Sequence, residues 1–145
     1  MSIASVDRIR WHLLGKTSNA DFYEVEPDLV AVVPFENSKD DEGTARESLA
    51  FQDAHWRAVG RRGAAVIFMD PVLEQDGGAR AVYANETQNA LTTCYALVGE
   101  TIYAYATSTV FTGLARPAVP TQVFRSFADA RPFIAQMNRE RGGAL

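Results

Sequence analysis

Cysteine and histidine are scarce in this sequence, which limits the chemistry that it can carry. Cys94 is the only cysteine among 145 residues, which excludes an internal disulfide and a cysteine-based metal site. A nucleophilic cysteine also needs a nearby histidine, and the spacing of the two histidines, His12 and His55, places neither beside it. Because Cys94 lies within the apolar residues 93–98, we expect an unreactive thiol in a buried strand.

Long hydrophobic runs and concentrated positive charge are missing as well. The longest apolar runs, such as residues 64–69, are far shorter than the ~20 residues of a membrane-spanning helix. No secretory signal pattern opens the sequence. The formal net charge of −4 opposes binding to nucleic-acid phosphates, and the basic pair Arg61-Arg62 between two glycines is typical of a solvated turn. We therefore expect a cytoplasmic protein with no membrane span and no nucleic-acid partner.

The composition that is present is that of an ordinary globular protein. Hydrophobic residues make up 47% and charged residues 22% of the chain, so neither disorder nor a membrane class is indicated. A chain of this length is the size of one domain. We expect a single domain over residues 21–140, an N-terminal extension over residues 1–20 that packs on it, and a disordered tail over residues 141–145.

The first part of the sequence predicts a hairpin, a loop and the start of a helix. Residues 22–26 and 29–35 are β-favouring runs separated by turn residues, which is typical of a hairpin. Residues 36–43 are polar and acidic and indicate a loop. Thr44 and Glu47 then have the spacing of a capping box, which predicts the start of a helix.

The rest of the sequence alternates between helix and strand. The first helix ends at Gly60 or Gly63, either of which supplies a left-handed stop, and residues 64–69 are typical of a central parallel strand covered on both faces. Residues 5–14 fit a short helix or an edge strand. The remaining segments are a helix over 77–90 capped by Asp76, a strand over 93–98, a helix over 101–114, a strand over 121–125 and a helix capped by Ser126 with Asp129.

This order predicts an α/β fold. Strands that alternate with helices imply right-handed crossover connections, so the later strands should be parallel. We expect a mixed central sheet of about five strands, which opens with the N-terminal hairpin, and about four helices.

Three segments carry a family resemblance. Residues 23–30 (YEVEPDLV) look like an opening hairpin, and residues 68–70 (FMD) look like a central strand that leads into a regulatory turn. Residues 116–124 (RPAVPTQVF) and 126–130 (SFADA) look like a last strand and a closing helix. Together they resemble the bacterial stand-alone members of the STAS family, the sulfate-transporter and anti-sigma-factor-antagonist domains that are also called SpoIIAA-like.

The resemblance implies a STAS-like sandwich and a non-enzymatic regulatory module that binds a protein partner. In the family, a partner kinase phosphorylates a serine at the start of the helix after the central strand, which switches binding through charge and bulk. The matching turn spans residues 75–78, and a glycine stands at the serine position. The expected partner-binding loop consists of Asp70, Glu74, Asp76, Gly77 and Gly78.

The carboxylates and glycines of the same loop also suggest two other kinds of chemistry. Asp70, Glu74 and Asp76 follow a central strand, where open α/β sheets place ligands, and three carboxylates could hold a divalent cation or act as acid and base. Gly77 and Gly78 offer amides to an anion, but the adjacent carboxylates would repel phosphate and no phosphate-binding motif is present. Acidic loops are common in a negatively charged chain. We therefore expect no enzyme, no metal and no cofactor.

An aromatic and apolar stripe supports an alternative function. Tyr103, Ala106, Val110 and Phe111 recur at helical spacing, and such stripes usually belong to the core. They could instead line a pocket between sheet and helix for an apolar small molecule or lipid, which would make the protein a carrier or sensor. The exposed edge of the hairpin could also pair with a second copy and form a homodimer.

Overall fold

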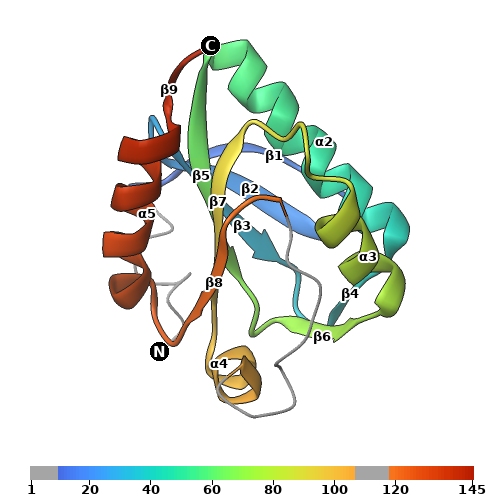
Figure 1. The fold of residues 1–145 in the computed structure, drawn as a ribbon. Helices are drawn as coiled ribbons and strands as arrows, with labels where there is room; N and C mark the ends of the chain where they lie inside the picture. The colour runs from blue at the N-terminus through green and yellow to red at the C-terminus, as the bar shows by residue number, and fades with distance from the viewer. Residues whose placement is uncertain (1–9, 107–117) are drawn as a thin grey trace.

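The chain folds around one twisted sheet with helices on both of its faces (Figure 1). The computed structural model describes residues 10–106 and 118–145. No helix within these residues is both long and apolar enough to cross a membrane. The elements follow in the order β1 (His12–Lys16), β2 (Ala20–Glu26), β3 (Leu29–Pro34), β4 (Ser38–Asp40), α2 (Glu42–Val59), β5 (Arg61–Phe68), β6 (Val72–Gln75), α3 (Gly77–Asn85), β7 (Thr92–Val98), α4 (Glu100–Ala106), β8 (Thr121–Phe124), α5 (Phe127–Arg141) and β9 (Gly143–Ala144).

The main sheet has the strand order β1-β2-β3-β5-β7-β8. Its first three strands are antiparallel neighbours, whereas β3, β5, β7 and β8 are parallel neighbours. The α/β class, the N-terminal hairpin, the parallel later strands and the expected four helices are thus confirmed in the part of the chain that the structure describes. The sheet is wider than the predicted five strands because residues 12–16 form the edge strand β1 and because β9 pairs with β5.

The two faces of the sheet are covered by different helices. Figure 1 shows α5 on one face and the pair α2 and α3 on the other. Successive side chains of a strand point to opposite faces: Ala64 and Val66 of β5 join the core under α5, and Ala65 faces the other side. β5 is therefore buried on both faces, as its continuous apolar run predicts.

Two glycines shape the connection from α2 into β5. Gly60 ends α2 with φ of 73°, a left-handed conformation that favours glycine, and it is one of the two predicted stops. Gly63 lies in β5, where an added Cβ would come 2.3 Å from Cη2 of Trp56 and 2.7 Å from the carbonyl oxygen of Asp28. The close packing of this strand on Trp56 requires glycine at position 63.

The start of α2 differs from the predicted capping box. Asp41 is the N-cap: its carboxylate accepts from the Thr44 amide at 2.9 Å, and the Thr44 hydroxyl accepts from the Asp41 amide at 2.8 Å. Thr44 is therefore the later member of the capping box and not its first residue. The first residue is Asp41, whose carboxylate binds the Thr44 amide. Glu47, which we expected to complete the box, instead accepts from the amide and hydroxyl of Ser18.

Three polar segments form strands where we predicted a loop, a turn and a disordered tail. The predicted loop of residues 36–43 contains β4, which pairs in parallel with β6. Residues 61–62 begin β5 and are not a turn, since they pair with β9. The same pairing holds the predicted tail of residues 141–145 against the sheet. In each segment the hydrogen-bonding partner lies at least ten residues away, so local polarity could not reveal the pairing.

Cys94 lies in β7 with no exposed surface. Burial raises the pKa of its thiol to about 12, which disfavours the reactive thiolate. The predicted position in a buried strand is confirmed.

Candidate functional site

A cavity of about 430 Å³ lies between the sheet and the helices α2 and α3. This volume is within the range of small-molecule binding sites. The strands β3, β5 and β7 line one side of the cavity, and α2 and α3 line the other. Residues of β4, β6 and α4 line its remaining borders.

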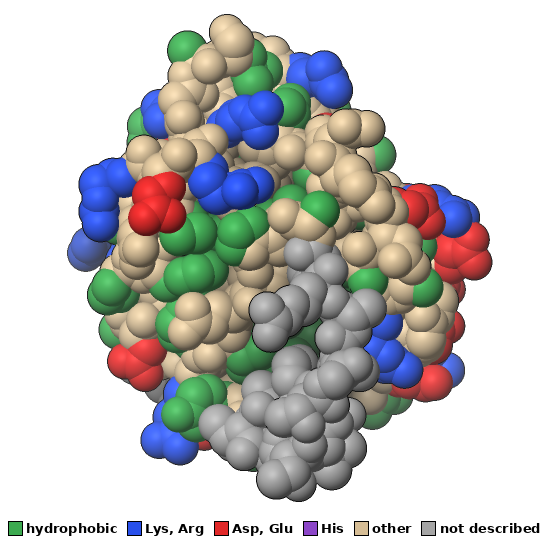
Figure 2. Space-filling view, viewed as in Figure 1, with side chains coloured by type: hydrophobic (Ala, Val, Ile, Leu, Met, Phe, Trp, Pro, Cys, Tyr) green, Lys and Arg blue, Asp and Glu red, His purple; other side chains and the backbone are tan. Residues whose placement is uncertain are grey.

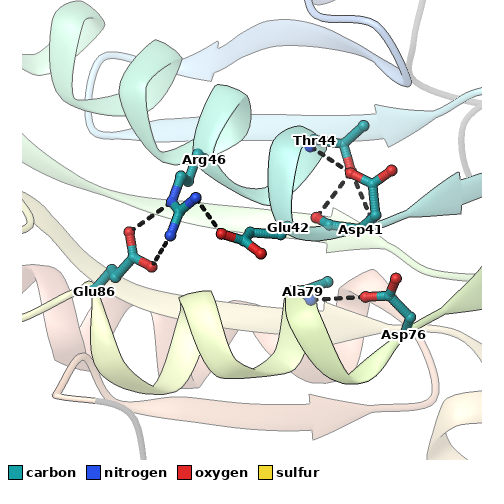
Figure 3. A network of polar contacts seen from close by, with 7 residues as sticks. All are labelled: Asp41, Glu42, Thr44, Arg46, Asp76, Ala79 and Glu86. Atoms are coloured by element: carbon teal, nitrogen blue, oxygen red, sulfur yellow. Dashed lines mark hydrogen bonds and ion pairs between the residues drawn. The ribbon is translucent and has the colours of Figure 1, made fainter.

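The cavity exists because α3 packs against α2 and does not lie flat on the sheet. Buried apolar residues of the two helices form a cluster of their own, which consists of Ala45, Ala79 and Val82. At the surface, Arg46 of α2 donates to both carboxylate oxygens of Glu86, the residue after α3, at 2.9 and 2.8 Å (Figure 3). α3 is thereby held as an outer wall, and the strands beneath it form the inner wall.

The inner wall is apolar. Val32 of β3, Ile67 of β5 and Leu97 of β7 line the cavity from neighbouring parallel strands. Ile67 and Leu97 are only partly buried although they lie in central strands. Their exposed surface faces the cavity, where a bound apolar group would cover it.

The α2 side of the cavity is polar. Ser48 and Gln52 line it and are buried. Gln52 donates to the Ser48 hydroxyl at 3.1 Å and accepts from Thr92 at 3.0 Å, and the Trp56 indole donates to Thr92 at 3.1 Å. These bonds hold Gln52 in place, while the Ser48 hydroxyl keeps a proton that it could donate to another group.

Asp40, the last residue of β4, brings a buried carboxylate to the cavity. Its Oδ1 accepts from the Thr44 hydroxyl at 2.6 Å. Its Oδ2 accepts from the Gln75 amide and from the Tyr83 hydroxyl, both at 3.0 Å. Burial, together with the negative charge of Asp40, raises the pKa of Tyr83, so the phenol stays protonated and donates.

Tyr95 of β7 also lines the cavity, with a hydroxyl that is not used. The side chain is 5% exposed, and its oxygen makes no hydrogen bond within the described ranges. Burial raises the pKa of Tyr95, and the charge of Asp53 acts in the same direction. A polar contact with the Thr92 hydroxyl acts against it, but that hydroxyl already donates its proton to Gln52, and it does not meet the Tyr95 oxygen with the geometry of a hydrogen bond. A buried hydroxyl without a partner costs free energy, so this group is free to bind a ligand.

The predicted partner-binding loop is not one continuous loop. Asp70 precedes β6 and accepts from the amide of Glu100 at 3.1 Å, at the start of α4. Glu74 lies exposed on β6. Within the described residues, no group of three or more histidine, cysteine, aspartate or glutamate side chains is placed to hold a metal ion.

The other three residues of the predicted loop lie together at the start of α3. Asp76 is the N-cap and accepts from the Ala79 amide at 2.9 Å (Figure 3), which confirms the predicted cap. Gly77 and Gly78 are the first two residues of the helix. The structure therefore brings Asp76, Gly77 and Gly78 together and places Asp70 at the other end of β6.

The residues predicted to form a pocket on the helix over 101–114 are only partly described. Tyr103 lies in α4, where the guanidinium of Arg125 sits 4.8 Å from the centre of its ring, and it does not line the cavity. Its neighbour Ile102 does. Ala106 is the last residue of α4, and the positions 110 and 111, Val110 and Phe111, lie outside the described residues.

The polar residues of the cavity were not predicted from the sequence. Ser48 and Gln52 share a helical stripe with the buried Ala45 and Trp56, so the spacing could have shown that two polar side chains point inward. Asp40 gave no such signal, because its neighbours in sequence are polar and its hydrogen-bonding partners lie on three different elements.

Comparison with known proteins gives a family but no function. The family model described as "Domain of unknown function (DUF7793)" matches residues 43–138, more than half of the chain. The match extends from α2 into α5 and so includes the elements on both sides of the cavity, but it excludes the hairpin and Asp40. No curated protein matches the chain. The chain therefore belongs to the DUF7793 family, a domain of unknown function.

Proposed function

We propose that this protein is a non-enzymatic module that binds a small amphipathic molecule between its sheet and the helices α2 and α3. The observation that carries the proposal is the cavity of about 430 Å³ into which Tyr95 brings a buried hydroxyl without a partner among the described residues. Folded proteins rarely leave such a group unpaired. A ligand would give it a partner and would cover the exposed parts of Ile67 and Leu97.

The test compares the protein with a variant whose cavity is filled. Mass spectrometry of gently purified protein is expected to release a bound compound on denaturation. Ala84→Phe places a ring in the cavity from α3 and should abolish binding. Ala50→Phe, on the exposed surface of α2, is the matched control and should keep it.

Two results would contradict the proposal. One is wild-type protein that releases no compound and whose Tm is raised by no member of a small-molecule library. The other is Ala84→Phe protein that binds as well as the Ala50→Phe control.

A second function, the binding of a protein partner near β6, is supported by one side chain. Leu73 of β6 is 65% exposed next to the exposed Glu74, and an exposed leucine beside a rim charge suits a protein interface. The sequential parallel strands, each followed by a helix, also support a STAS-like scaffold. Gly77 and Gly78 carry no hydroxyl, so this interface would act without the family's serine switch.

This second function predicts a localised loss of binding. Leu73→Asp should weaken capture of a purified partner at least about tenfold. Val59→Asp, at a 47% exposed valine at the end of α2, should leave capture unchanged. Equal capture by both variants would exclude the β6 surface.

A further inference from the structure

The charge of Asp40 indicates which kind of ligand the cavity accepts. The three groups that donate to this carboxylate, the side chains of Thr44, Gln75 and Tyr83, are all neutral. None of the ion pairs within the described ranges involves Asp40. A buried carboxylate is normally paired with a cation, because hydrogen bonds from neutral groups offset only part of its lost hydration.

Asp40 also keeps the capacity to accept another bond. A carboxylate offers about four acceptor positions, and the protein fills one on Oδ1 and two on Oδ2. Oδ1 therefore keeps an acceptor position that no described protein group fills.

Two aromatic rings line the same cavity. Tyr83 and Tyr95 come from opposite walls, α3 and β7. The face of a tyrosine ring attracts an organic cation, and this attraction strengthens when water is excluded. The two rings and the Asp40 carboxylate therefore both favour a positively charged ligand.

Arg80 is the other charged side chain that lines the cavity, and it would favour an anion. It is exposed, and its guanidinium donates to the backbone oxygen of Gln75 at 2.6 Å. An anion paired with Arg80 would sit in contact with solvent, where charge pairs contribute little. Because the buried charge is that of Asp40, it determines the sign of the ligand charge that the cavity favours.

The surface around α3 and the first part of α2 is acidic, like Asp40. Figure 2 shows acidic side chains gathered, with fewer basic ones among them, along the margin formed by α3 and the first part of α2. Acidic residues on this side of the molecule are Asp41, Glu42, Glu74, Asp76 and Glu86. Glu42 and Glu86 share one cation, Arg46, so this group of carboxylates keeps an excess of negative charge. A field of this sign attracts cations and repels anions on approach.

We propose that the cavity binds a small organic cation, an amine or quaternary ammonium with an apolar body, and that Asp40 is its counter-charge. The cationic group lies beside Asp40, Tyr83 and Tyr95, and the apolar body covers Ile67 and Leu97. This inference rests on the proposed ligand-binding function and adds the charge of the ligand to it.

Three probes with the same ring and different head groups test the charge. Phenethylamine, 2-phenylethanol and 3-phenylpropionate carry a cation, a neutral hydroxyl and an anion. In calorimetric titrations of the wild-type protein, the amine is expected to bind at least about tenfold more tightly than the other two. This comparison needs no variant, so it holds even if a substitution at Asp40 prevents folding.

Substitutions then assign the preference to a residue. Asp40→Asn keeps the shape of the side chain and removes its charge, and it should reduce the preference for the amine to less than about threefold. Asp129→Asn, at an exposed position of α5, is the matched control and should keep the full preference for the amine.

The outcomes separate this inference from the function on which it rests. If the alcohol binds as tightly as the amine, or the carboxylate binds best, and Ala84→Phe abolishes that binding, the charge assignment is wrong and the ligand-binding function stands. If no probe binds, the charge of a co-purified compound decides: a cation supports the inference, and a neutral or anionic compound overturns it. If no probe binds, no compound co-purifies and no library member raises the Tm, both proposals fail. A library member that does raise the Tm decides the charge in the same way as a co-purified compound.

Discussion

The two faces of the sheet carry different kinds of packing. Under α5, the rings of Trp11, Phe68 and Phe127 lie with their centres 5.8 to 6.0 Å apart and fill the space between helix and sheet. Under α2 and α3, the inward stripe contains Ser48 and Gln52, and a cavity remains. The large apolar side chains beneath α5 pack directly between this helix and the sheet. The inward side of α2 is polar, and α3 packs on α2 instead of on the sheet, so space for a ligand remains there.

The largest expected loss of stability is on the face of the sheet that α5 covers. Phe127→Ala should lower the free energy of unfolding by about 3–5 kcal/mol, because it removes a buried ring that packs on Trp11 and Phe68 and leaves a cavity in its place. Urea denaturation measures this. Phe133→Ala, which removes a half-buried ring from the same helix, should cost clearly less, and equal losses would contradict the view that the aromatic cluster closes this face.

A smaller loss of stability is expected from the hydrogen-bond network of Trp56, Thr92 and Gln52, on the face of the sheet that α2 and α3 cover. Thr92→Val keeps the shape of the side chain but removes the hydroxyl that accepts from Trp56 and donates to Gln52. Two buried groups would lose a partner, so we expect a loss of about 1–3 kcal/mol in urea denaturation. Thr121→Val, which removes an exposed hydroxyl with one bond to the carbonyl oxygen of Val119, should cost clearly less. A neutral Thr92→Val would show that the network does not hold this face together.

His55 makes stability depend on pH. Burial lowers its pKa below the ordinary 6.5, and the charge of Glu24 opposes this only in part. The unfolded chain therefore binds a proton at a higher pH than the folded protein, so stability is full above about pH 6.5 and falls as the pH drops through the window below it. The urea midpoint of His55→Gln should fall less than that of the wild type between pH 8 and pH 5.

The contrary outcome is a His55→Gln midpoint that falls as far as that of the wild type between pH 8 and pH 5. Another group would then be responsible for the loss.

The smallest effect on stability is expected at Tyr95. Tyr95→Phe removes a hydroxyl that has no partner among the described residues, so the ligand-free protein should be unchanged or slightly more stable in thermal denaturation. Binding of phenethylamine should weaken, because the ligand loses this hydrogen bond. A clear loss of stability without ligand would show that the hydroxyl already serves the fold.

The sequence predicted much of the scaffold and little of the site. The alternation of apolar runs with turn residues and caps located β5, β7, β8 and the caps Asp76 and Ser126, because periodicity and capping are local properties. The β4–β6 and β5–β9 pairings were not predictable, since strand pairing between polar segments depends on neighbours far along the chain. The cavity residues Asp40, Tyr83 and Tyr95 meet only in space.

By itself, the sequence determined the α/β class, the parallel core strands, the buried Cys94 and the approximate starts of the main helices. These follow from which side chains must leave water and at what period they recur. The tertiary structure alone decided that α3 leans on α2, that a cavity opens beside β5 and β7, and that a carboxylate from β4 enters it. These features depend on how whole elements pack, and no local pattern encodes the space that packing leaves unfilled.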